Sequence, residues 1–292
     1  MMKFQGCYTA LVTPFKDGAL DEAALRKVVR FQLRGGVAGL VACGSTGEAA
    51  TLSMEESERV VRITVEEAGG RVPVVAGVGT NDTAKAVKLA KEAERWGADA
   101  LLVLVPYYNK PTQEGMFRHF KAVAEASSLP IIAYNIPGRT GVNMLPQTLL
   151  RIASELPSVR AVKEAAGLLD QVSEILCSAP KGFSVLSGDD SLTLPMMAVG
   201  ATGVVSVVSN ILPRETQKLC DLALKGDFSA AAKLHLKLFP FIKALFVETN
   251  PIPVKAAAHA LGLCADELRL PLTTISPDAR KALAAALRKV GL

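Results

Sequence analysis

The chain has 292 residues, half of them hydrophobic and 21% charged, and carries a formal net charge of +5 at pH 7. This length and apolar content suffice for one large domain with a substantial core. Basic residues are interleaved with acidic ones, which argues against nucleic-acid binding by a dense basic block, and the apolar runs are too short to cross a bilayer. The mild positive excess is compatible with small anionic substrates.

The cysteines and the N-terminus indicate the compartment. Five cysteines lie far apart, with neither a CxxC pair nor the spacing of metal ligands, at Cys7, Cys43, Cys177, Cys220 and Cys264. An odd number of scattered cysteines is typical of reduced thiols in an intracellular protein. The first residues lack the long apolar segment and the cleavage site of a signal peptide. We therefore expect a soluble, cytoplasmic protein without a metal site.

Eight short runs rich in β-forming residues recur along the chain. They are almost continuously apolar, which is typical of strands whose outer face is covered by helices. The runs are residues 7–13, 39–44, 72–79, 100–106, 130–135, 160–164, 183–189 and 203–209.

Helical segments lie between these runs. Residues 21–36 carry an apolar stripe and end in glycine, residues 53–70 open with the capping-box pair Ser53 and Glu56, and residues 145–156 have Pro146 in their first turn. Eight strand–helix units in residues 1–225 predict an α/β fold, a (β/α)₈ TIM barrel. A doubly wound open sheet is the alternative, but no GxGxxG follows the first strand. For residues 226–292 the sequence predicts a C-terminal helical region that packs on the barrel.

In such barrels, catalytic residues lie at the C-terminal ends of the strands. The sequence places "GSTGE" (44–48), "PYYNKP" (106–111), "YNIPGRTG" (134–141), Lys163 and "SGDD" (187–190) at these ends. Each has a plainer interpretation, as a glycine turn, core tyrosines, a surface arginine or turn residues. The three histidines fall within predicted helices, where we expect structural roles.

Lys163 is the least ordinary of these residues. Alternation along its strand puts it on the same face as Ala161 and Ala165, opposite Val162. If that face is the barrel interior, desolvation lowers the pKa of the amine, and a neutral amine near pH 7 attacks a carbonyl to form a Schiff base. The alternative is an outward lysine lying between helices.

The other strand ends supply what a Schiff-base enzyme needs. A proton relay requires hydroxyl groups, which Tyr134 and Ser45 offer. An α-keto acid carboxylate requires N–H or hydroxyl donors, and the turn that contains Thr46 offers both. A second anionic substrate would be bound well by the guanidinium of Arg139.

With these residues, the sequence resembles the superfamily of pyruvate-dependent class I aldolases that includes dihydrodipicolinate synthase and N-acetylneuraminate lyase. The resemblance covers essentially the full chain and is carried by "GSTGE", "YNIPGRTG", "VKEAAG" and "NPIPVK". It implies a lyase without a cofactor, in which Lys163 forms the Schiff base with pyruvate. Further implied roles are a proton relay of Tyr134, Ser45 and Tyr108 of a neighbouring subunit, a pyruvate pocket of Thr46, Gly188 and Val205, and a homotetramer built as a dimer of dimers.

The second substrate depends on Arg139. Within the superfamily the arginine of "PGRTG" is typical of enzymes that condense pyruvate with L-aspartate-4-semialdehyde in the diaminopimelate pathway to lysine. Ser45 stands where those enzymes usually carry threonine, and "GSTGE" is also found in N-acetylneuraminate lyases. An N-acetylneuraminate lyase or a sugar-acid aldolase is therefore the alternative.

The resemblance also bears on regulation, because many such synthases are inhibited by lysine. Sensitive members typically carry a polar side chain on the helix after "GSTGE" and a glutamate after the third strand. Here Met54 and Ser57 lie on that helix, and Lys85 replaces the acid. A cation in place of a carboxylate repels the amine of lysine, so we expect weak or absent inhibition. The alternative is that Lys85 points to solvent and lysine binds through the remaining polar groups, Asn81 and Tyr107.

Overall fold

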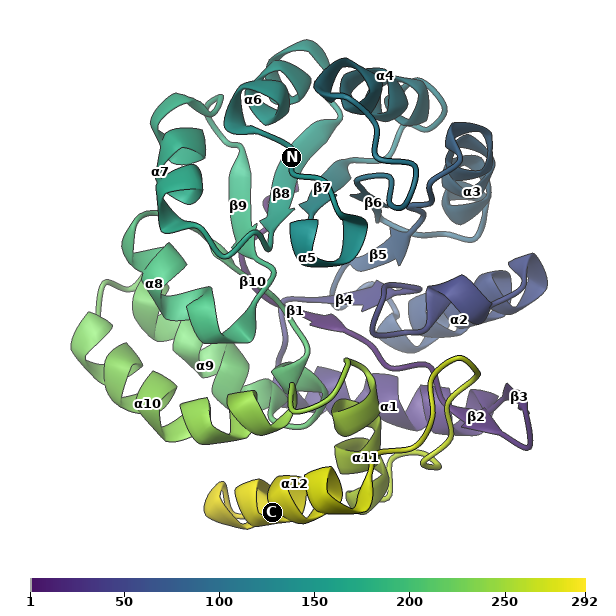
Figure 1. Ribbon diagram of the computed structural model, residues 1–292, viewed down its shortest axis with the longest axis vertical. Helices are drawn as coiled ribbons and strands as arrows, with labels where there is room; N and C mark the ends of the chain where they lie inside the picture. Colours follow the sequence, from purple (N-terminus) through teal and green to yellow (C-terminus); the bar gives the residue numbers. More distant parts are fainter. Residues whose placement is uncertain (1) are drawn as a thin grey trace.

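The computed structural model describes residues 2–292, and its centre is a closed barrel of eight parallel strands ringed by helices (Figure 1). Each of the eight predicted runs overlaps one of these strands, so the predicted (β/α)₈ fold is confirmed. The strands are β1 (Gly6–Ala10), β4 (Gly39–Ala42), β5 (Val74–Gly77), β6 (Ala100–Leu104), β7 (Ile131–Asn135), β8 (Val159–Glu164), β9 (Ser184–Ser187) and β10 (Gly203–Ser206).

Helices connect successive strands and cover the outside of the barrel. The capping box at the start of α2 is present: the Ser53 hydroxyl accepts from the Glu56 backbone N–H, and the Glu56 carboxylate accepts from that of Ser53. The covering helices are α1 (Glu22–Gly35), α2 (Met54–Ala68), α3 (Thr83–Arg95), α4 (Gln113–Ala124), α6 (Pro146–Glu155), α7 (Leu169–Ser178), α8 (Thr193–Ala198) and α9 (Pro213–Leu224).

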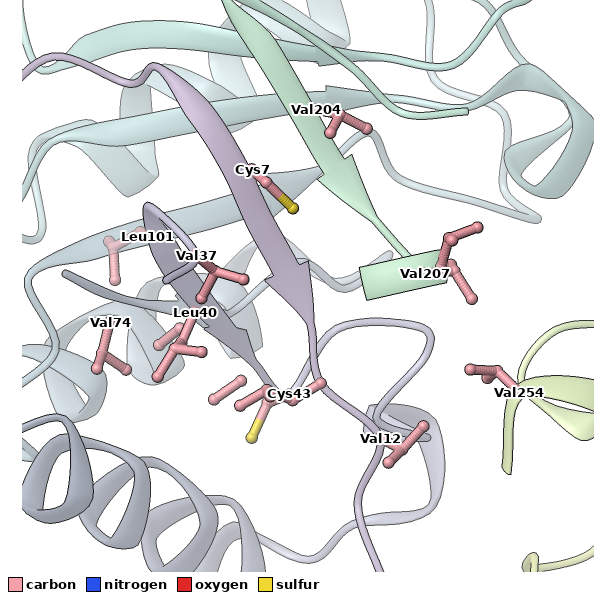
Figure 2. Close-up of a cluster of buried hydrophobic side chains, with 14 of the residues drawn as sticks. Cys7, Val12, Val37, Leu40, Cys43, Val74, Leu101, Val204, Val207 and Val254 are labelled. Carbon is pink, nitrogen blue, oxygen red and sulfur yellow. The ribbon is translucent and has the colours of Figure 1, made fainter. Parts of the chain in front are cut away.

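Two apolar layers stabilise this arrangement, one on each face of the strands. The larger layer lies between strands and helices, and Figure 2 shows part of it, with Cys7, Leu40 and Val74 from successive strands. The smaller layer fills the barrel interior and includes Ala161 of β8, whereas Val162 belongs to the outer layer. Because side chains alternate along a strand, Lys163 points to the interior, as predicted.

The last part of the chain is helical and returns to the barrel. It comprises α10 (Phe228–Ala244), which packs on α8 and α9, α11 (Ile252–Ala260) and α12 (Pro277–Lys289). A small antiparallel hairpin of β2 (Phe15–Lys16) and β3 (Ala19–Leu20), which was not predicted, precedes α1. Within residues 2–292 no helix has the length and apolar character needed to cross a membrane.

A buried ion pair joins this C-terminal part to the second strand–helix loop. The Lys255 Nζ of α11 lies 2.5 Å from Glu48 Oε1, and both side chains are almost completely inaccessible to solvent. The backbone N–H of Arg269 donates to the other Glu48 oxygen at 3.1 Å. The Phe15 ring contacts both cations, with its centre 4.3 Å from Lys255 Nζ and 4.2 Å from the Arg269 guanidinium carbon. The loop that carries "GSTGE" is thus fixed from the C-terminal side of the chain.

Candidate active site

The residues predicted for the site come from several strands of the barrel. Lys163 and Val205 lie on β8 and β10 themselves, and Tyr134 is paired directly with Lys163 in the β7–β8 register. Thr46 follows β4, and Arg139 lies on α5 (Pro137–Thr140), the single helical turn after β7. All of these positions are at or just after the C-terminal ends of strands, where barrel enzymes carry their chemistry.

A cavity of about 780 Å³ opens at this end of the barrel. Its wall includes the predicted residues Ser45, Tyr134 and Arg139. The C-terminal region contributes part of the wall with residues 249–251, 271 and 272, which had not been predicted as site residues. Thr46 and Lys163 are buried, 3% and 6% exposed, and do not line the cavity themselves. The volume is ample for two small substrates together.

Lys163 has the surroundings of a nucleophilic amine. Its Nζ lies 4.1 Å from the centre of the Tyr134 ring, on the ring face. Burial lowers the pKa of this amine from 10.5 to about 7; the carboxylate of Asp190 opposes the decrease and the guanidinium of Arg139 adds to it. Near neutral pH a large fraction of the amine is therefore unprotonated and able to attack a carbonyl carbon.

Tyr134 is buried beside this amine, 5% exposed. Burial raises the pKa of its hydroxyl well above the ordinary value of 10, and the positive charge of Arg139 opposes that rise. The phenol is therefore protonated at neutral pH. It is suited to donate and accept protons in relay with a neighbouring hydroxyl, not to act as a permanent base.

Gly188 packs directly against the strand that carries Lys163. A β-carbon at this position would lie 3.2 Å from Lys163 Cγ and 2.6 Å from Ala165 Cβ. The Gly188 N–H also donates to the carbonyl of Glu164 at 2.7 Å. Only glycine lets the loop after β9 approach the lysine so closely. Val205, on β10, is 1% exposed. Like Tyr134 on β7, it belongs to the apolar layer in the barrel interior.

Thr46 and Arg139 share one partner that the sequence reasoning missed. The side-chain amide of Asn250 donates to Thr46 Oγ1 at 3.0 Å, and the Arg139 guanidinium donates to the Asn250 carbonyl at 2.9 Å. In the sequence, the motif "NPIPVK" indicated only the resemblance to the aldolase superfamily and gave no role to Asn250. Its asparagine lies more than one hundred residues from both partners, and no local pattern indicates the contact.

Tyr108, unlike Ser45, Tyr134 and Arg139, does not line the cavity. Its side chain is 87% exposed, and its backbone has a positive φ of 69°. For a tyrosine this is an unusual backbone conformation, of the kind that is kept where the surrounding structure requires it.

The remaining polar candidates have structural partners. Asp189 caps a short 3₁₀ helix by accepting from the Ser191 backbone N–H, as predicted for turn residues. Asp190 is buried, which raises the pKa of its carboxyl to about 6 although Ser206 Oγ and two backbone N–H groups donate to it. His119 is buried against Thr83, and desolvation lowers its pKa to about 4.

A (β/α)₈ barrel with a desolvated lysine on an interior strand face has the architecture of the class I aldolases. The chain belongs to the dihydrodipicolinate synthetase family, whose profile matches residues 3–290. The 4-hydroxy-tetrahydrodipicolinate synthase of Pelobacter propionicus is 52% identical over 289 residues, with 99% of each chain covered. The crystal structure of the dihydrodipicolinate synthase from Aquifex aeolicus matches with a TM-score of 0.98 at 49% identity, and that of the Cyanidioschyzon merolae enzyme with lysine bound matches with 0.97 at 39% identity, each covering 99% of both chains.

Replacement of Lys163 by methionine should raise the free energy of unfolding in a pH-dependent way. The folded pKa of about 7 lies below the ordinary 10.5, so between these values the folded chain binds fewer protons than the unfolded chain. Stability therefore increases with pH in this window, and the penalty is largest at pH 7 and below. Lys163→Met removes the penalty, with an expected gain of about 3 kcal/mol at pH 8 that vanishes near pH 10.5.

Chemical denaturation of both proteins between pH 7 and 10 measures this difference. Lys85→Met is the matched control, because the Lys85 side chain is 76% exposed and water solvates it in both states. A gain that stays constant across the pH range would contradict desolvation as its cause.

Proposed function

We propose that the protein is a 4-hydroxy-tetrahydrodipicolinate synthase, which condenses pyruvate with L-aspartate-4-semialdehyde in the diaminopimelate pathway to lysine. The observation that carries the proposal is the desolvated Lys163 amine, stacked on Tyr134, in a chain about 50% identical to such synthases over its full length. The reaction needs only a small ketoacid, a small aldehyde and proton transfers.

In this proposal the Lys163 amine adds to the ketone carbon of pyruvate. Loss of the carbinolamine hydroxyl as water gives the protonated imine, and loss of a methyl proton gives the enamine. The enamine carbon attacks the aldehyde carbonyl of the second substrate and forms the new carbon–carbon bond. Attack of the substrate amine on the imine carbon then releases Lys163 and closes the product ring. Tyr134 and Ser45 carry the protons between these steps.

Two groups are proposed to bind the substrate carboxylates, the neutral donors around Thr46 and the charged guanidinium of Arg139. Thr46 and neighbouring backbone N–H groups bind the carboxylate of pyruvate, with Gly188 and Val205 completing the pocket. Arg139 binds the carboxylate of the semialdehyde through its guanidinium. A sugar-acid substrate, which would present hydroxyl groups here, gains less from this cation.

Reduction with cyanoborohydride in the presence of pyruvate should attach a stable pyruvate-derived mass to the peptide that contains Lys163. The trapping rate should fall as the pH drops below 7, because protonation of an amine with a pKa of about 7 removes the nucleophile. Peptide mass spectrometry locates the adduct, and Lys163→Met is the control without it. Labelling at another lysine would rule out the mechanism.

Arg139→Ala should raise the KM for L-aspartate-4-semialdehyde by roughly tenfold or more, the usual size of a lost hydrogen bond to a charged group. Pyruvate trapping on Lys163 should remain nearly intact. Arg118→Ala is the surface control, since Arg118 lies on α4 with its side chain 76% exposed. Equal losses for both substrates would argue against a separate aldehyde carboxylate site.

The exposure of Tyr108 supports an assembly in which this residue completes the relay of a neighbouring subunit, within a homotetramer built as a dimer of dimers. If so, Tyr108→Phe and Lys163→Met should each be nearly inactive alone. Mixed dimers should regain about half of the activity, because one of their two sites holds both native residues. Co-expression followed by an assay of the purified mixed species tests this, and a fully active monomer would contradict it.

We also propose that L-lysine is a weak inhibitor, although a relative has been crystallised with lysine bound. Met54, Ser57 and Lys85 all line the cavity. Half-inhibition is expected above about 1 mM, the weak end of specific binding. Lys85→Glu should strengthen inhibition by restoring an anionic partner for the lysine amine, whereas Lys121→Glu on α4 should not. Half-inhibition of the unmodified protein well below 1 mM would contradict the charge argument.

A further inference from the structure

Asn250 occupies a connecting position between the two proposed carboxylate sites. It lies in the segment between α10 and α11 and is only 6% exposed. Its side chain contacts Thr46, 204 residues away, and its backbone carbonyl contacts Arg139, 111 residues away. One residue of the C-terminal region thus touches the group proposed for pyruvate and the group proposed for the aldehyde.

The direction of the Thr46 contact determines what the threonine hydroxyl can do. A hydroxyl has one proton and two acceptor lone pairs. Because the Asn250 amide donates to Thr46 Oγ1, it occupies a lone pair and leaves the hydroxyl proton free for another acceptor. A substrate carboxylate offers only acceptors, so this orientation favours its binding.

When the Asn250 side-chain amide makes this contact, its own oxygen atom is left without a partner. Asn250 Oδ1 is buried and has no hydrogen-bond partner among residues 2–292. Buried amides in a purely structural role are usually satisfied on both sides. The donor side of Asn250 is therefore directed at Thr46 while its acceptor side stays unpaired.

The residues that follow Asn250 hold it in position next to the turn that carries Thr46. The Lys255 backbone N–H donates to the Pro251 carbonyl at 2.9 Å, and the Lys255 side chain pairs with Glu48, two residues after Thr46. The turn that carries Thr46 and the segment that carries Asn250 are thus joined twice, once by the ion pair and once by the amide.

We infer that Asn250 is a positioning residue that directs the Thr46 hydroxyl proton toward the pyruvate carboxylate through its side chain and holds Arg139 through its backbone. The inference rests on the proposed function. The two contacts of Asn250 should have separate effects. Its side chain affects pyruvate binding through Thr46. Its backbone carbonyl, which every substitution retains, holds the Arg139 guanidinium in position.

The test is a double-mutant cycle on the pyruvate concentration that half-saturates cyanoborohydride trapping of Lys163, a readout independent of the second substrate. Asn250→Ala is expected to raise this concentration about fivefold to tenfold, as for one lost hydrogen bond. Thr46→Val should raise it at least as much, and the double variant no further, because both changes remove the same interaction. Asn250→Asp should have a larger effect than Asn250→Ala, since a carboxylate accepts the Thr46 proton and repels the substrate. The aldehyde KM of Asn250→Ala should change less than twofold.

The buried pair Thr9–Gln32, joined at 3.0 Å on the outer face of β1, provides the matched control. Thr9→Val and Gln32→Ala should lower stability without changing half-saturation by pyruvate. Additive effects of the Asn250 and Thr46 variants, or equal losses for both substrates, would overturn the inference while pyruvate trapping in the unmodified protein still supports the proposed function. Should Asn250→Ala fold poorly, Asn250→Asp tests the inference with a near-isosteric side chain, because it should weaken half-saturation by pyruvate while its aldehyde KM changes little. Absence of trapping in the unmodified protein would overturn both.

Discussion

Removal of water from a single primary amine is the constraint on which the rest of the site depends. The closed ring of strands leaves no edge through which solvent reaches Lys163, and the residues two positions before and after it are Ala161 and Ala165. The aromatic face of Tyr134 covers the amine, and Gly188 lets the next loop come within contact distance of the strand. These features act together to lower the pKa of the amine. An open sheet or a bulkier residue at position 188 would admit water or displace the nucleophile.

The chain contains a second buried lysine, and the comparison explains why only one of them is suited to be a nucleophile. Desolvation also lowers the pKa of Lys255, but the nearby Glu48 carboxylate opposes the decrease. The pair at 2.5 Å keeps the ammonium form engaged, and its contribution is structural. Among residues 2–292, the charges that act on Lys163 are those of Asp190 and Arg139, and neither forms an ion pair with it. The property that distinguishes Lys163 from Lys255 is therefore the lack of a close anion among the described residues, and not burial.

Much of this was accessible from the sequence, for reasons that particular residues make clear. Strands covered on both faces read as continuous apolar runs, so all eight were found, and alternation along β8 placed Lys163 correctly in the interior. The hairpin β2–β3 was missed because two-residue strands leave no periodicity. Asn250 was missed because its contacts span more than one hundred residues and asparagine carries no signal of its own. Lys255 was within reach: it is a lysine in the otherwise apolar helix "IPVKAAAHA", the same anomaly that singled out Lys163.

The contacts of Asn250 and Lys255 also set an order of events during protein synthesis. The last barrel strand is complete at residue 206, but the residues that fix the "GSTGE" loop follow more than forty positions later. A nascent chain emerging from the ribosome therefore contains every strand of the barrel before it contains a finished active site. A chain that ends before residue 250 lacks both Asn250 and Lys255, so Thr46 and Glu48 are without these partners. The "GSTGE" loop therefore reaches its final arrangement only after the C-terminal region has been synthesised.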